Sequence, residues 1–98
     1  MQISKPVWYA NPKEVVLSVD PDKVKISPLG NEVVIVIEID GDLRRATVPA
    51  KAFDQKRRTV VAAEVGEMGS SVLVSFPPGS SGTTTWAIPK SLIESLLV

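Results

Sequence analysis

The apolar residues of this chain fall into short runs in which apolar and polar positions alternate, with turn-forming residues between the runs. Val24 and Ile26 alternate with two lysines, whereas 32–39 is almost continuously apolar and β-branched, as in a central strand. Period-two alternation and β-branched enrichment favour strands over helices. The pattern predicts strands at 14–19, 23–27, 32–39, 43–48, 59–65, 72–76 and 83–88.

The residues between these runs specify how the strands are joined. Asp40-Gly41 predicts a tight hairpin turn, because glycine accepts a positive φ without a Cβ clash. Pro49 has no N–H and ends its strand, so 50–54 is predicted as a single helical turn. Pro89 in the same way permits a short helical turn through about residue 97.

One arrangement occurs twice along the chain. A glycine precedes an apolar strand, a hairpin follows, and the returning strand ends in an apolar residue and a proline, with Gly30 and Pro49 in the first copy and Gly69 and Pro89 in the second. The glycines are 39 positions apart and the prolines 40. This spacing predicts an internal duplication of a unit of about 40 residues. The alternative is that two hairpins of any all-β domain look this similar.

Length and strand spacing together indicate one all-β domain spanning 1–98. A chain of 98 residues fits one hydrophobic core. Six or seven short strands at close spacing predict a small barrel with a short C-terminal helical turn and an N-terminal arm over 1–13. Alternate positions of the central strands are expected to form the core, namely Ile35, Ile37, Val72, Val74, Phe76 and Ile88.

The segment 86–96, which reads Trp-Ala-Ile-Pro-Lys-Ser-Leu-Ile-Glu-Ser-Leu, resembles the end of SH3-like barrels. There a strand closes with an apolar-proline step and a helical turn, and 48–53 is a weaker second instance. The resemblance implies a small β-barrel. Peptide-binding SH3 domains carry aromatics in an early loop, and none lies between Val24 and Val48, so recognition of proline-rich peptides is not expected. The duplication instead favours swapped-hairpin or double-psi barrels, which are built from two similar halves.

The amino-acid composition lacks the side chains that most catalytic sites use. The chain has no Cys and no His, which excludes disulfides, thiolate zinc ligands and the usual general base. We therefore expect no enzymatic activity, no cofactor and no metal site. The start of the chain lacks the order of a secretory signal, and no apolar run is long enough to span a membrane, so a cytoplasmic location is expected.

Charge is balanced overall but uneven along the chain. Eleven basic and eleven acidic residues give zero net charge, yet 44–58 carries six cations opposed only by Asp54. Those cations are Arg44, Arg45, Lys51, Lys56, Arg57 and Arg58. Such a stretch suits phosphates or an acidic partner. The alternative is that these side chains are solvated strand edges, where long cations discourage edge-to-edge pairing.

Three of the five aromatics lie near the chain ends, at Trp8, Tyr9 and Trp86. Aromatic residues anchor ordered termini, and exposed aromatics dominate the energetics of interfaces. The leading hypothesis is a non-catalytic protein-interaction or assembly module, using Trp8 or Trp86 with a protein partner or a second copy. The alternative hypothesis is a nucleic-acid-binding barrel that uses the basic residues of 44–58, with Trp86 as a stacking platform.

Overall fold

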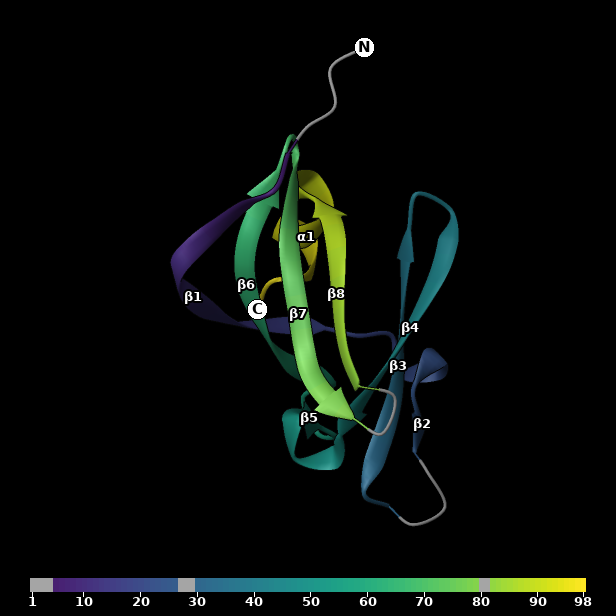
Figure 1. Ribbon diagram of the computed structural model, residues 1–98. Helices are drawn as coiled ribbons and strands as arrows, with labels where there is room; N and C mark the ends of the chain where they lie inside the picture. The colour runs from purple at the N-terminus through teal and green to yellow at the C-terminus, as the bar shows by residue number, and fades with distance from the viewer. Residues whose placement is uncertain (1–4, 27–29, 80–81) are drawn as a thin grey trace.

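The computed structural model describes residues 5–26, 30–79 and 82–98 as an antiparallel β fold that ends in one short helix (Figure 1). The strands are β1 (Val7–Ser18), β2 (Lys25–Ile26), β3 (Glu32–Ile39), β4 (Asp42–Pro49), β5 (Phe53–Asp54), β6 (Thr59–Met68), β7 (Ser71–Gly79) and β8 (Gly82–Pro89). The 3₁₀ turns η1 (Pro21–Lys23) and η2 (Ala50–Ala52) and the helix α1 (Lys90–Leu96) complete the described elements. The all-β class and the C-terminal helical segment are thereby confirmed.

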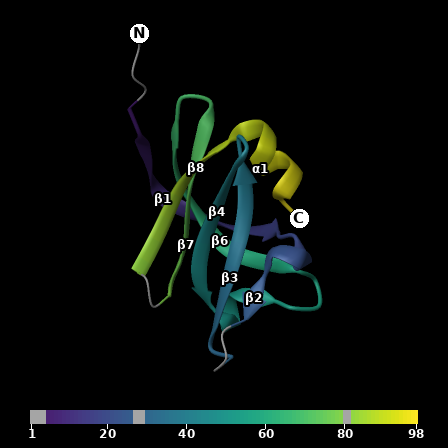
Figure 2. The ribbon, with the colours of Figure 1, turned by 90° about the vertical axis from the view of Figure 1, so that its right-hand side faces the viewer.

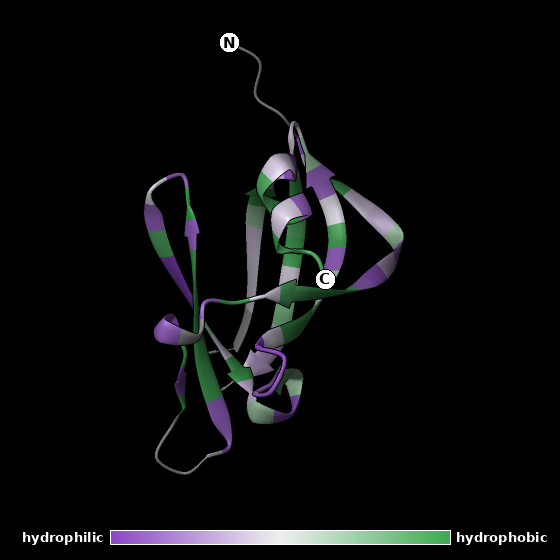
Figure 3. Ribbon diagram, turned by 180° about the vertical axis from the view of Figure 1, so that it is seen from behind, coloured by the Kyte–Doolittle hydropathy of each residue, from purple (hydrophilic) through white to green (hydrophobic). Residues whose placement is uncertain are grey.

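The strands form two sheets. The larger has the order β1-β6-β7-β8, with β5 also pairing β6, and the smaller has the order β2-β3-β4. Figure 2 shows the three-stranded sheet in front of the larger one. Apolar side chains from the facing surfaces fill the space between the sheets, and β3 is apolar along most of its length (Figure 3). The core therefore lies between two sheets, as in a sandwich.

The prediction of a barrel was wrong, because the described strands number eight and do not close. The tip of the β3–β4 hairpin diverges from β8 in Figure 1. Cross-strand pairing explains this, since Asp42 faces Ile39 and Arg44 faces Ile37 on the core side of the sheet. Closing the barrel over this tip would bury two charged side chains, which is costly without partners.

Strand β1 begins at Val7, so 7–13 of the predicted N-terminal arm belongs to a strand. The sequence Trp-Tyr-Ala-Asn-Pro-Lys has no period-two alternation, which is why the prediction began only at residue 14. Gly66 makes the early pairing possible, because a Cβ there would collide with the Val7 carbonyl oxygen and come within 3.2 Å of the Trp8 Cα. The pairing of β1 with β6 then shifts register between Trp8 and Lys13.

The predicted core is confirmed. Each of the six residues expected inside is at most 6% exposed. Leu17, Val33, Val48 and Val60 join them as fully buried side chains. No buried side-chain nitrogen or oxygen in the described residues lacks a hydrogen-bond partner. The facing sheets are thus held together by an apolar interior.

The two hairpins share local geometry. The predicted Asp40-Gly41 turn is present, and both residues have positive φ, +50° and +84°, as a type I′ turn requires. After each hairpin the chain enters a helical turn, where Ala50 N–H donates to the Asn31 carbonyl and Lys90 N–H to the Ser70 carbonyl, each at 3.0 Å. The strand orders β2-β3-β4 and β6-β7-β8 are also alike. The two hairpins thus share a strand order and a hydrogen bond at the turn that follows them.

Candidate functional site

The six basic residues of 44–58 are all exposed, but they lie in different places. Arg44 and Arg45 are neighbours on β4, and successive side chains of a strand point to opposite faces. Arg44 pairs across the sheet with Ile37 on the core side, whereas Arg45 pairs with Val36 on the outer side. Adjacent positions in the sequence therefore contribute to two different surfaces.

Three other cations occupy the β5–β6 turn, which is fixed by hydrogen bonds. The Asp54 carboxylate accepts from the backbone N–H groups of Lys56 and Arg57, each at 3.0 Å. Arg58 N–H donates to the Asp54 carbonyl at 2.7 Å, and the Arg58 carbonyl accepts from Val19 N–H at 3.0 Å. The only carboxylate in the basic stretch is thus engaged by the backbone, and the turn presents its cations to solvent.

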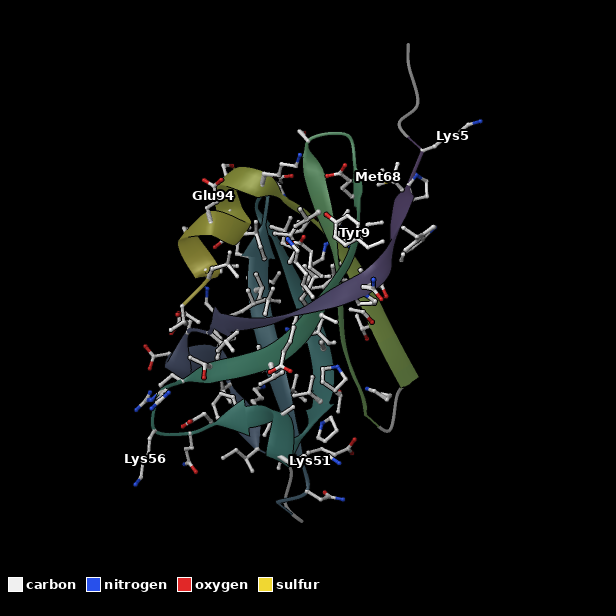
Figure 4. All side chains as sticks on the ribbon, turned by 90° about the vertical axis from the view of Figure 1, so that its left-hand side faces the viewer. Lys5, Tyr9, Lys51, Lys56, Met68 and Glu94 are labelled. Carbon is white, nitrogen blue, oxygen red and sulfur yellow. The ribbon has the colours of Figure 1, made fainter. Side chains whose placement is uncertain are left out.

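Lys51 lies on η2, at the same end of the molecule as Lys56 (Figure 4). Both line a surface hollow of about 540 Å³ that also includes Phe53. Arg58 lines a different hollow of about 230 Å³, together with Val24 and Ile26. The structure therefore brings Lys51 and Lys56 to one hollow and leaves Arg44 and Arg45 apart from them.

The two tryptophans have opposite environments. Trp86 is only 7% exposed and packs in the core, so the prediction that it serves as an accessible stacking platform was wrong. Trp8 on β1 is 61% exposed, and its neighbour Val7 is 58% exposed. Of the two, Trp8 alone is available to a partner.

Tyr9 lies beside two carboxylates of β6, and its position is shown in Figure 4. Its partial burial and its hydrogen bond with Glu64 raise the pKa of the phenol, and the negative charges of Glu64 and Glu67 add to this effect. A neutral phenol with a raised pKa is a hydrogen-bond donor rather than a nucleophile at neutral pH.

The outer face of the three-stranded sheet carries apolar residues that sequence reasoning did not single out. Val34 and Val36 of β3 are half-buried and Leu43 of β4 is 53% exposed. They lie in neighbouring rows of the sheet, because Val36 pairs with Arg45 and Glu38 with Leu43. This face is turned toward the viewer in Figure 2.

Cations border these apolar residues. A hollow of about 300 Å³ has Val34, Val36 and Leu43 as its apolar lining, with Lys23, Lys25, Arg45 and the single acid Asp22 beside them. The three apolar and three basic residues are called the outer-face site below. Lys25 pairs across the sheet with Val34, which places a cation directly beside the apolar row.

The three cations of the outer-face site differ in their ion pairing. Lys23 approaches the Asp20 carboxylate at 4.0 Å, with both side chains well exposed. Among the described residues, no carboxylate forms an ion pair with Lys25 or Arg45. The lining of the hollow, with three cations and Asp22, therefore combines apolar area with a net charge of +2. Glu38, which pairs with Leu43, adds an exposed acid to the same face.

The signal for this site was present in the continuous apolar run of 32–39. Such a run predicts a strand buried on both faces. In the structure only one face of β3 meets the core, since Val33, Ile35, Ile37 and Ile39 are buried while the residues between them are not. The sequence thus showed the valines, but it did not show that the outer face of the three-stranded sheet leaves them uncovered.

Other kinds of site find no support in the described ranges. No three acidic residues there come together as a metal site needs. No helix in these ranges is long and apolar enough to cross a membrane. The chain is thus an antiparallel two-sheet domain whose surface offers an apolar and cationic face and a basic turn. Comparison with models of protein families, with curated proteins and with solved structures gives no match, so its function is inferred from geometry alone.

Proposed function

We propose that this domain is a non-catalytic protein-interaction module whose outer-face site binds a protein segment bearing acidic and apolar side chains. One observation carries the proposal: the solvent side of the β2-β3-β4 sheet presents Val34, Val36 and Leu43 beside cations. Of these cations, Lys25 and Arg45 form no ion pair within the described residues. An antiparallel sheet covered on one side ordinarily has polar residues on the other. Contiguous apolar area with a polar rim marks an interaction surface.

The charges of the outer-face site support a partner with acidic side chains. Lys23, Lys25 and Arg45 attract carboxylates, and complementary charges raise the association rate and exclude cationic competitors. The half-buried valines and Leu43 supply the apolar area that gives such a contact its affinity. A partner that is only acidic would leave this area in water, and one that is only apolar would leave the cations unpaired.

A non-catalytic role agrees with the residue types that are present. The chain has neither His nor Cys, the side chains that most often act as base or nucleophile near neutral pH. The carboxylates of Asp20 and Asp22 flank Pro21, and those of Asp40 and Asp42 flank Gly41 at the start of β4. The Asp20 carboxylate accepts a hydrogen bond from the Asp22 backbone N–H at 3.0 Å, as in a turn. Surface recognition is the use that remains.

The test uses a labelled peptide of alternating glutamate and leucine and its lysine-leucine counterpart, with affinity measured by fluorescence anisotropy. The acidic peptide should bind and the basic peptide should not. Arg45→Glu should weaken binding about tenfold or more, because it places a like charge against the peptide. Leu43→Asn should weaken it without changing the salt dependence.

Arg44→Glu is the matched control, since it makes the same charge change one residue away on the opposite face of β4. It should retain most of the affinity. Equal losses in Arg44→Glu and Arg45→Glu would show a nonspecific charge effect and contradict the outer-face site. Failure of the acidic peptide to bind at all would remove the proposal.

A second candidate function, nucleic-acid binding, is favoured by the basic β5–β6 turn. Lys56, Arg57 and Arg58 are exposed there, and Asp54 is engaged by the backbone. Binding to duplex DNA should then fall with salt by about 0.9 logarithmic units per contacted phosphate, and alanine at all three positions should reduce the slope by up to about 2.7. If no binding is seen at about 50 mM salt, this function is excluded.

A further inference from the structure

Strand β8 is a free edge of the larger sheet. It pairs with β7 on one side, and within the described residues no strand pairs with its other side. The next cross-strand pair, Ser70 and Lys90, shows which residues of β8 bond to β7. In that pair the Lys90 N–H donates to the Ser70 carbonyl. In an antiparallel pair hydrogen-bonded positions alternate, so Thr84, Trp86 and Ile88 bond to β7. The backbone N–H and C=O groups of Thr85 and Ala87 therefore point away from the sheet.

The other edges of the described sheets carry features that prevent pairing. The outer edge of β1 is partly covered by the C-terminal residues, where Leu97 bridges to Leu17 and Val98 N–H donates to the Val16 carbonyl at 3.1 Å. The edge of β4 carries Arg44 and Arg45. Strand β2 is only two residues long. Charged side chains, short strands and coverage are the usual means by which proteins block edge-to-edge association.

Strand β8 is neither short nor charged, and no strand of the described residues covers its outer edge. No charged residue occurs from Pro77 to Pro89, and β8 is eight residues long and rich in threonine, a residue that favours strands. The Thr85 side chain is exposed, while Trp86 and Ile88 turn into the core. A long, uncharged edge of this composition is a template for another strand.

We infer that β8 pairs antiparallel with β8 of a second copy of this chain, giving a twofold-symmetric dimer with one continuous sheet. The outward backbone groups of Thr85 lie near the middle of β8 and therefore face Thr85 of the partner copy, while Ala87 faces residue 83. A twofold contact must be self-complementary, and a neutral edge meets this requirement because like charges do not face each other. Cross-strand threonine pairs are among the favourable ones.

The absence of charge also selects a second copy over the acidic segment proposed above. An acidic strand added at β8 would find no cation on that strand, whereas the outer-face site supplies several. The dimer goes beyond the proposed function and does not depend on it, because the two contacts use different sheets. Each can fail without the other.

The experiment measures mass in solution over a concentration series by light scattering after gel filtration. The unchanged protein should be a dimer. Thr85→Lys and Thr85→Glu each place like charges across the twofold axis and should weaken dimerisation about tenfold or more. An equimolar mixture of the two variants should restore the dimer, since lysine then faces glutamate.

Ser18→Lys, at an exposed position of β1, is the control and should leave the dimer intact. Circular dichroism of each variant establishes that it is folded. A protein that stays monomeric to about 1 mM, a dimer that persists in both Thr85 variants, or a mixture that stays monomeric would each overturn the inference. Thr85→Lys should keep its affinity for the acidic peptide, which separates this result from a failure of the proposed function.

Discussion

The rings of Phe76 and Trp86 pack edge to face, with centroids 4.8 Å apart and an angle of 61° between their planes. Phe76 lies on β7 and Trp86 on β8, both on the face that meets the three-stranded sheet. Aromatic pairs in this geometry stabilise a fold by about 0.5–1.5 kcal/mol beyond the area they bury. The contact between these rings therefore anchors β8, the strand with the free edge, to the core.

Trp86→Ala should lower the free energy of unfolding by about 3–5 kcal/mol, as expected for truncation of a buried aromatic side chain. Trp8→Ala is the control, because Trp8 is 61% exposed, and it should change stability by no more than about 0.5 kcal/mol. Urea unfolding of both variants by circular dichroism makes the comparison. Similar losses in the two variants would mean that Trp8 also has a structural role.

The aliphatic core gives a second prediction. Ile35 and Val74 are completely buried on facing sheets, and Ile35→Ala or Val74→Ala should each cost about 2–4 kcal/mol through lost burial and the cavity that remains. Val7→Ala, at a position 58% exposed, is the control and should cost much less. Thermal or urea unfolding measures all three. A loss below about 1 kcal/mol at both core positions would contradict the packing of the two sheets.

Local signals in the sequence predicted the strands well. Residues 32–39 are followed by the Asp40-Gly41 turn, which fixes the register of the hairpin, and β3 has the predicted limits. The burial of Trp86 was also within reach, because it lies two positions before Ile88 on the same strand and hence on the same face. Alternation along one strand is local information, and the sequence carries it directly.

Contacts between segments that are distant in the chain could not be predicted from the sequence. Whether the barrel closes depends on how the β3–β4 hairpin lies against β8, and no local pattern specifies that. The outer-face site likewise depends on the pairing of Lys25 with Val34, which brings a cation from a two-residue strand beside the valines. Such contacts are set by tertiary packing. The sequence therefore showed the basic stretch 44–58, but it could not show that these cations lie on different surfaces.

The repeated hairpins give a third prediction. Gly30 and Gly69 precede β3 and β7, and both have positive φ, +72° and +60°. If the two units are structurally equivalent, Gly30→Ala and Gly69→Ala should each destabilise by about 1–2 kcal/mol, the cost of a left-handed conformation for an L-residue. Asparagine at either position should recover part of the loss, because it tolerates this region. Unfolding costs that differ by several fold would argue against equivalence.

The titration of Tyr9 tests the pairing of β1 with β6. Tyr9 is the only tyrosine, so the ultraviolet absorbance of the phenolate reports its ionisation alone. Partial burial, the hydrogen bond with Glu64 and the charge of Glu67 should place its pKa above the ordinary value of 10.0. Glu64→Gln should move the pKa back toward that value but not fully to it, since the burial remains. Glu14→Gln is the control and should leave it unchanged.

The raised pKa of Tyr9 also determines how the stability of the protein should change with pH. A phenol whose pKa is higher in the folded than in the unfolded protein holds its proton more tightly in the folded state, so its contribution is complete below the unfolded pKa of about 10. That contribution is lost as the pH rises through the folded pKa, and the free energy of unfolding should fall over this range. Urea midpoints measured on either side of pH 10 should show a smaller fall in Glu64→Gln than in the unchanged protein. A folded-state pKa at or below 10, with no difference between the two proteins, would mean that Tyr9 does not meet Glu64 and that β1 pairs differently near its start.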